Sequence, residues 1–133
     1  KALKANAAVA LLTDQVPPEG LGVWAPFFGK SAYTMTLAAR LALQSGAALL
    51  PVRLLRLPRG AGYDMEILPP LTGLNSTPPP DLLQAVTLLN ECIESLILSQ
   101  PGHYLWAYAR YKKPRGAPAA TADSSADNGK EST

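Results

Sequence analysis

The sequence predicts a small α/β domain with a disordered C-terminal tail, and three observations support this fold class. Residues 7–13 form a continuous apolar run that is typical of a strand buried on both faces. Residues 31–45 place apolar side chains at helical spacing, and residues 47–57 form a second apolar run. Strand, helix and strand in this order predict a βαβ unit with a right-handed crossover. The 133 residues suit one domain, which we place at residues 1–115, with the tail at residues 116–133.

Turn and cap residues flank these first elements. Residues 1–6 are typical of the last turn of a helix, with Asn6 as its cap. Residues 14–26 contain three prolines and two glycines, which predict a loop. Ser31 is a favourable N-cap residue, and Gly46 is placed to end the helix that follows.

The second predicted strand leads into a hairpin. Pro51 lies inside residues 47–57, which indicates an edge strand or a bulge. Residues 58–62 form a turn, and residues 63–68 alternate polar and apolar side chains. That alternation predicts a strand that pairs back on the previous one. Residues 69–80 then form a proline-rich connector.

A second helix is predicted after this connector. Asp81 is a favourable N-cap residue, and Gln84 completes the spacing of a capping box. Pro101 and Gly102 end the helix. The face expected to point to the core carries Leu82, Val86, Leu89, Ile93 and Leu96, widened by Cys92 and Ile97.

Composition and charge narrow the class of protein. Eleven of the 12 basic and seven of the 10 acidic residues lie in residues 1–115. A weakly basic body suits an anionic lipid or an acidic carrier protein, although an ordinary soluble surface has the same charge. Cys92 is the only cysteine, which excludes an internal disulfide and suits a reducing compartment. No apolar run reaches the ~20 residues that span a bilayer. The chain begins at Lys1 instead of Met, which predicts that it is part of a longer protein.

Short motifs follow one another along residues 1–116. They are Leu-Leu-Thr-Asp-Gln at 11–15, Phe-Phe-Gly at 27–29, Pro-Val at 51–52, Tyr-Leu-Trp at 104–106 and Arg-Tyr-Lys at 110–112. In this order and spacing they resemble the C-terminal half of the bacterial lipid A biosynthesis (lauroyl/myristoyl) acyltransferase family. The sequence departs from that family at Tyr108 and Ala109, where many members carry His and Arg.

The resemblance implies a fold and an activity. It implies part of the mixed sheet, flanked by helices, of the glycerophosphate acyltransferases. It also implies transfer of a fatty acyl chain from acyl carrier protein, or from coenzyme A, to a hydroxyl of a lipid A precursor. No bound cofactor and no nucleic-acid partner are expected. The enzyme would act at the cytoplasmic face of the bacterial inner membrane, where this segment would be peripheral and an anchor would lie in a preceding part.

The family's catalytic pair is a histidine followed four residues later by an acid. The histidine would take the proton from the acceptor hydroxyl, and the acid would orient the histidine. The only histidine here is His103, and position 107 is Ala107. The motif is therefore absent, which predicts that this chain alone is inactive.

Candidate binding residues fall into three groups. Asp14 and Gln15 follow the first predicted strand, where α/β sheets place ligand groups, although Asp14 could simply brace the loop. The run Phe27, Phe28, Gly29 and Lys30 could wall an acyl chain, with an anion bound at the start of the next helix. Ordinary core packing and helix capping are the alternative for that run.

The third group lies in the aromatic and basic segment 103–113. Arg110 is expected to meet an anionic ligand or to form a structural ion pair, and Trp106 to pack in the core. Alternating aromatic and cationic residues also suit a membrane interface or single-stranded nucleic acid. A non-enzymatic binding module is therefore the alternative function.

Overall fold

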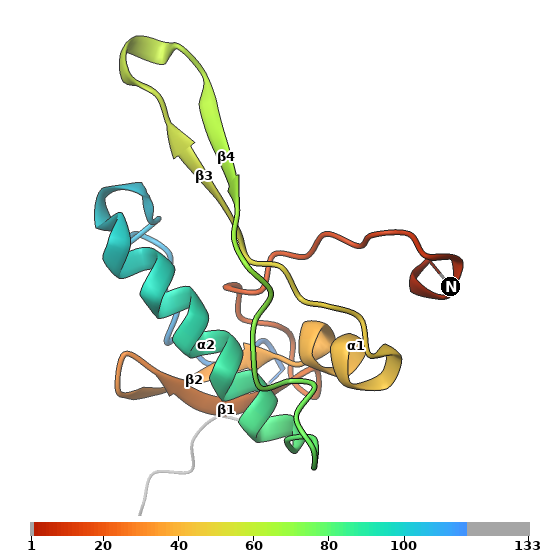
Figure 1. Ribbon diagram of the computed structural model, residues 1–133. Helices are drawn as coiled ribbons and strands as arrows, with labels where there is room; N and C mark the ends of the chain where they lie inside the picture. The colour runs from red at the N-terminus through yellow and green to blue at the C-terminus, as the bar shows by residue number, and fades with distance from the viewer. Residues whose placement is uncertain (1, 117–133) are drawn as a thin grey trace, which may run out of the picture.

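The computed structural model describes residues 2–116, and over this range the chain has the predicted α/β class (Figure 1). It contains two separate two-stranded antiparallel sheets and two α-helices. The strands are β1 (Gly22–Phe27) with β2 (Lys30–Met35), and β3 (Val52–Arg56) with β4 (Tyr63–Ile67). The α-helices are α1 (Leu37–Ser45) and α2 (Leu82–Ser99), and short 3₁₀ turns occur at Leu3–Ala5, Pro58–Gly60 and Pro101–His103. The predicted tail lies outside the described residues, apart from Gly116.

The β1–β2 hairpin replaces the first half of the predicted first helix. Phe28 (φ 47°) and Gly29 (φ 72°) are both left-handed, as a two-residue type I′ hairpin turn requires. The turn folds the following residues back against β1, so Ser31 pairs in β2 and does not cap a helix. The helix predicted to start at Ser31 is wrong there, because ladder hydrogen bonds to β1 satisfy this backbone. The helix begins at Leu37 and ends, as predicted, at a left-handed Gly46.

The core lies where the two helices meet the β1–β2 hairpin. Figure 1 shows α2 lying across this hairpin. Alanines dominate the contact and let the backbones approach closely. The main buried cluster consists of Ala25, Ala38, Ala39, Ala42, Leu74, Ala85, Val86 and Leu89. A smaller cluster of Phe27, Ala32 and Ile97 lies near the hairpin turn.

The predicted capping box of α2 is confirmed. The backbone N–H of Gln84 donates to the Asp81 carboxylate at 2.8 Å. The backbone N–H of Asp81 donates to the side-chain oxygen of Gln84 at 2.9 Å. Among the described residues, α2 is the one helix long and apolar enough to cross a membrane by length and composition. Its Asn90 and Glu94 side chains hydrogen-bond to the backbone of the β1–β2 hairpin, so one face of this helix packs on the hairpin.

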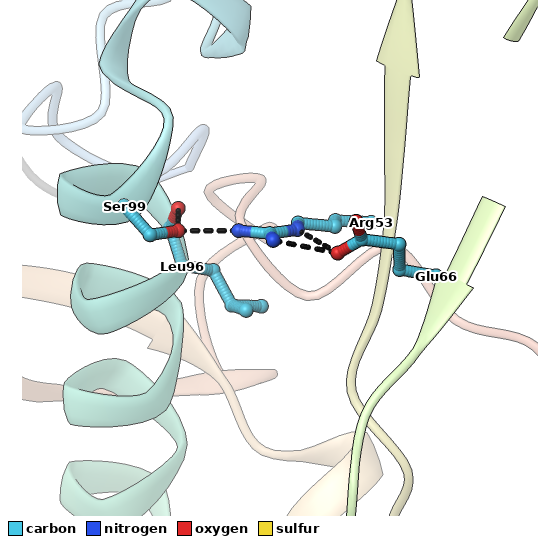
Figure 2. A network of polar contacts seen from close by, with 4 residues as sticks. All are labelled: Arg53, Glu66, Leu96 and Ser99. Atoms are coloured by element: carbon cyan, nitrogen blue, oxygen red, sulfur yellow. Dashed lines mark hydrogen bonds and ion pairs between the residues drawn. The ribbon is translucent and has the colours of Figure 1, made fainter. Parts of the chain in front are cut away.

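The predicted β3–β4 hairpin is confirmed, and it projects away from the body of the molecule (Figure 1). Strand β3 starts at Val52, directly after Pro51, and is therefore shorter than the predicted strand 47–57. Arg53 connects the projecting ribbon to α2, as Figure 2 shows. Its guanidinium lies 2.6 Å from the Glu66 carboxylate of β4 and donates to the Ser99 hydroxyl of α2.

The predicted βαβ unit is wrong for the described part of the chain. Residues 7–13 form no strand, and Val9 and Leu12 are 45% and 73% exposed. Helix α1 connects strands of two different sheets. A strand buried on both faces needs neighbouring strands and covering helices. Residues 2–116 place no strand beside this run.

Candidate functional site

Three side chains from other parts of the chain fix the Phe-Phe-Gly turn of the β1–β2 hairpin. The Phe28 amide donates to the Glu94 carboxylate of α2 at 2.7 Å. The Tyr111 hydroxyl donates to the Phe27 carbonyl at 2.8 Å. The Arg110 guanidinium lies 4.9 Å from the centre of the Phe27 ring, within cation–π range. The two phenylalanines therefore have a fixed geometry although they sit at a hairpin tip.

A buried polar network lies beneath this turn. The side chains of Thr34, Asn90 and Arg110 are each at most 3% exposed. Asn90 Nδ2 donates to the Pro26 carbonyl at 2.7 Å and to the Thr34 hydroxyl at 3.2 Å. Arg110 donates through Nη1 to the Tyr33 carbonyl at 2.9 Å and through Nη2 to the Thr34 hydroxyl at 2.7 Å. The network joins α2 and β2 to the aromatic and basic segment 103–113, here called the C-terminal segment.

The cation of Arg110 is buried against neutral oxygens. No carboxylate of the described residues lies within ion-pair distance of it. Burial lowers the pKa of Arg110, whereas the nearby Tyr104 and Asp14 raise it. Burial and the charge of Asp14 both raise the pKa of Tyr104, so these three groups share one electrostatic environment. Both Nη groups donate hydrogen bonds to β2 of the hairpin, and the cation lies over the Phe27 ring. Arg110 therefore has a positioning role for Phe27.

An aromatic pocket of about 260 Å³ lies between the turn and the C-terminal segment. Its walls are Phe27, Phe28, Tyr104, Trp106, Tyr108 and Tyr111, together with Ala109, Arg110 and Lys112. Trp106 is 60% exposed and its indole N–H donates to the Pro101 carbonyl at 2.8 Å. The expectation that Trp106 packs in the core is therefore wrong, since its ring forms an open wall of this pocket.

The structure brings some predicted site residues together and separates others. Phe27, Phe28 and Arg110 meet at the aromatic pocket. Gly29 and Lys30 are exposed at the outer end of the turn. Because Lys30 begins strand β2 and no helix starts after it until Leu37, the anion site expected at a helix start is wrong.

Asp14 and Gln15 lie outside the aromatic pocket. Asp14 is half-buried and is close enough to affect the pKa values of Arg110 and Tyr104. Gln15 is exposed. Neither follows a strand, because residues 7–13 form none.

Comparison with known proteins connects this architecture to a family. The profile of the family described as "Bacterial lipid A biosynthesis acyltransferase" matches residues 1–113. The chain belongs to the bacterial lipid A biosynthesis acyltransferase family.

Individual members of the family are similar over most of this chain. The Escherichia coli (strain K12) lipid A biosynthesis lauroyltransferase is 34% identical over 120 residues, which cover 89% of this chain and 38% of that protein. The lipid A biosynthesis palmitoleoyltransferase of the same organism is 35% identical over 84% of this chain and 35% of its own length. The lipid A biosynthesis acyltransferase of Shigella flexneri gives the same values. The chain thus spans less than two fifths of these acyltransferases.

The sequence did not reveal two side chains that shape this part of the acyltransferase fold. Asn90 and Glu94 fix the backbone of the hairpin from α2. They lie one helical turn apart, beside the apolar residues Val86, Ile93 and Ile97. Two polar residues inside an apolar helix face could have indicated this contact, because buried polar groups normally have a specific hydrogen-bond partner.

Proposed function

We propose that this chain is the C-terminal part of an enzyme that transfers a fatty acyl chain to a hydroxyl of a lipid A precursor. The donor is acyl carrier protein, or coenzyme A. The enzyme acts at the cytoplasmic face of the bacterial inner membrane, and this segment is peripheral to the bilayer. Family membership over residues 1–113 supports acyl transfer. The names of the relatives support lipid A biosynthesis as the pathway.

The fixed geometry of Phe27 and Phe28 is the observation that assigns the acyl-chain site to this turn. An acyl chain has no hydrogen-bonding groups, so its position depends on preformed apolar walls. Phe27 and Phe28 provide such walls, and Glu94 and Tyr111 hold their backbone. Phe28 also adopts a left-handed conformation, which is costly for a bulky residue and is often found at functional sites.

The remaining predicted residues take supporting roles in this proposal. Asp14 acts on the electrostatic environment of Arg110, and Gln15 follows it at the surface. Gly29 and Lys30 present an open backbone and a cation at the rim of the turn. Arg110 contributes by positioning Phe27.

The chemistry requires a base that this segment does not provide. In the transfer, the acceptor hydroxyl loses its proton, its oxygen attacks the thioester carbonyl, and the thiol of the donor leaves. His103 is exposed, and no acid follows it at the spacing of the catalytic pair, because position 107 is Ala107. We therefore assign the proton transfer to a His–acid pair in the preceding part of the enzyme.

A chimera tests this proposal. This chain replaces the matching C-terminal part of the Escherichia coli lauroyltransferase, and acyl transfer to a lipid A precursor is followed by mass spectrometry. We expect a product from the chimera and none from the isolated chain. Phe28→Ala in the chimera should lower the rate by about tenfold, or ~1.4 kcal/mol of transition-state stabilisation. Tyr63→Ala, which removes an exposed aromatic ring from the distant β4, should leave the rate unchanged.

Two results would contradict the proposal. A folded chimera without activity would remove the assignment to acyl transfer. An active chimera in which Phe28→Ala has no more effect than Tyr63→Ala would remove the aromatic turn from the site.

A further inference from the structure

A second cavity of about 390 Å³ lies beside the aromatic pocket. One wall is formed by Val16, Pro17 and Pro18, and the other by Lys112, Lys113 and Arg115. Three of its six lining residues are cations and none is acidic. Basic side chains that converge on one concave surface attract phosphate and carboxylate groups.

The two walls of this cationic cavity are joined by hydrogen bonds. The Val16 amide donates to the Tyr108 hydroxyl at 2.8 Å, and the Glu19 amide donates to the Arg115 carbonyl at 3.0 Å. Pro17 is buried, which fixes the first wall against the body. The backbone of the two walls is therefore fixed before a ligand binds, which lowers the entropy cost of binding there.

Lys112 connects the cationic cavity to the aromatic pocket, because it lines both. Its ammonium lies 4.7 Å from the centre of the Tyr108 ring. Tyr108 lines the aromatic pocket together with Trp106 and Phe28, whose ring centres are 6.4 Å apart. A cationic cavity thus adjoins a mainly aromatic one, which is the arrangement that suits an amphiphile.

We propose that these adjoining cavities bind a phosphate-bearing amphiphile. Lys113, Arg115 and Lys112 would hold the phosphate, and the apolar part would lie over Trp106 and Phe28. The inference deepens the proposed function, because it names the phosphate of the lipid acceptor as the group recognised by the C-terminal segment. Binding needs no catalysis, so its failure and the failure of the proposed function are separate results.

The experiment uses the full chain and the fluorescence of Trp106. Trp24→Phe leaves Trp106 as the single tryptophan. Dihexanoyl phosphatidic acid, inorganic phosphate and dihexanoyl phosphatidylcholine are titrated separately, at low and at high salt. We expect phosphatidic acid to bind most tightly and to shift the Trp106 emission. Inorganic phosphate should bind more weakly and leave the emission unchanged. Phosphatidylcholine, whose phosphate charge is balanced by choline, should bind at least about tenfold more weakly than phosphatidic acid. High salt should weaken the binding of phosphatidic acid.

Matched double variants test whether this particular cavity is used. Lys113→Gln with Arg115→Gln should weaken binding of phosphatidic acid at least about tenfold, because two charge-assisted contacts are lost. Arg56→Gln with Arg59→Gln removes the same net charge from the projecting β3–β4 hairpin and should leave binding unchanged. Circular dichroism checks that both variants fold.

Each contrary outcome overturns a defined part of the inference. Equal losses in the two double variants would indicate general attraction to a basic protein. Equal binding of phosphatidic acid and phosphatidylcholine would remove the phosphate site. Inorganic phosphate that binds as tightly as phosphatidic acid would remove the link to the aromatic pocket. Absence of binding by the folded chain would overturn the whole proposal.

Discussion

Arg110 shows how one buried cation can organise a surface site. Its two Nη groups donate to a carbonyl and to the Thr34 hydroxyl, and its charge lies over the Phe27 ring. The Thr34 hydroxyl in turn donates to the Ala32 carbonyl at 3.1 Å and also accepts from Asn90. The planar fork of a guanidinium can bond two acceptors at once, which a lysine ammonium does less well. Neutral oxygens therefore replace water at the two Nη groups and an aromatic face covers the cation, whereas Nε has no hydrogen-bond partner among the described residues.

The first prediction concerns this residue. Arg110→Ala should lower the free energy of unfolding by about 2–4 kcal/mol, since it removes two hydrogen bonds and leaves buried acceptors unpaired. Arg110→Lys should recover only part of this loss. Urea denaturation of the full chain measures both values.

Arg40→Ala is the matched control, because it removes the same charge from an exposed position on α1. It should change the free energy of unfolding by less than about 0.5 kcal/mol. If Arg110→Ala costs no more than Arg40→Ala, the network beneath the hairpin does not stabilise the fold.

At the scale of elements, the Phe28-Gly29 turn decides the identity of the segment that follows it. Left-handed backbone at both positions matches the twist of a two-residue hairpin. Residues 30–35 then pair with β1, and the α1 helix is confined to Leu37–Ser45. The same turn presents Phe28 to the aromatic pocket, so one local conformation shapes both the fold and the site.

The second prediction tests the conformation of this turn. Gly29→Ala should lower the free energy of unfolding by about 1 kcal/mol, because an L-residue is disfavoured in the left-handed region. A Cβ at this position would meet no atom within 4 Å, so the cost is conformational and not steric. Thermal unfolding of the full chain gives the difference.

Gly102→Ala provides the comparison for this variant. A Cβ there also has open space, but the backbone of Gly102 is not left-handed. It should be nearly neutral. Equal effects of the two substitutions would argue against a type I′ turn at Phe28-Gly29.

At the scale of the whole molecule, residues 2–116 expose apolar side chains on two segments that lie away from the core. One is the run of residues 7–12, which forms no strand. The other is the outer face of the β3–β4 ribbon, where Leu54 pairs with Met65 and both are about 60% exposed. The inner face of this ribbon carries Arg53, which bonds toward α2 (Figure 2). Exposed apolar patches of this kind mark interaction surfaces or sites of aggregation.

The third prediction is that this chain, studied alone, self-associates. Sedimentation velocity should show a concentration-dependent increase in mass. Leu12→Glu with Leu54→Lys should reduce that increase without changing net charge, because charged groups oppose burial of both surfaces.

Asn75→Glu with Ser95→Lys is the charge-matched control at exposed polar positions, and it should associate as the parent chain does. A parent chain that remains a monomer at every concentration would show that neither apolar surface drives association.

The sequence alone determined the parts of this protein that depend on near neighbours. The capping box at Asp81 and Gln84, the β3–β4 hairpin and the end of α1 at Gly46 follow from residues a few positions apart. The order of short motifs along the chain indicated the acyltransferase family, which the comparison confirmed.

Only the tertiary structure decided the parts that depend on distant partners. Arg110 bonds to Tyr33 across 77 positions, and Glu94 bonds to Phe28 across 66. No periodicity predicts such pairs, because the chain path brings them together. The apolar run at residues 7–13 shows the same limit, because its composition predicts a buried strand whereas the structure leaves it without a strand and mostly exposed. Apolar composition makes burial favourable, but a strand forms only where a neighbouring strand accepts its backbone hydrogen bonds.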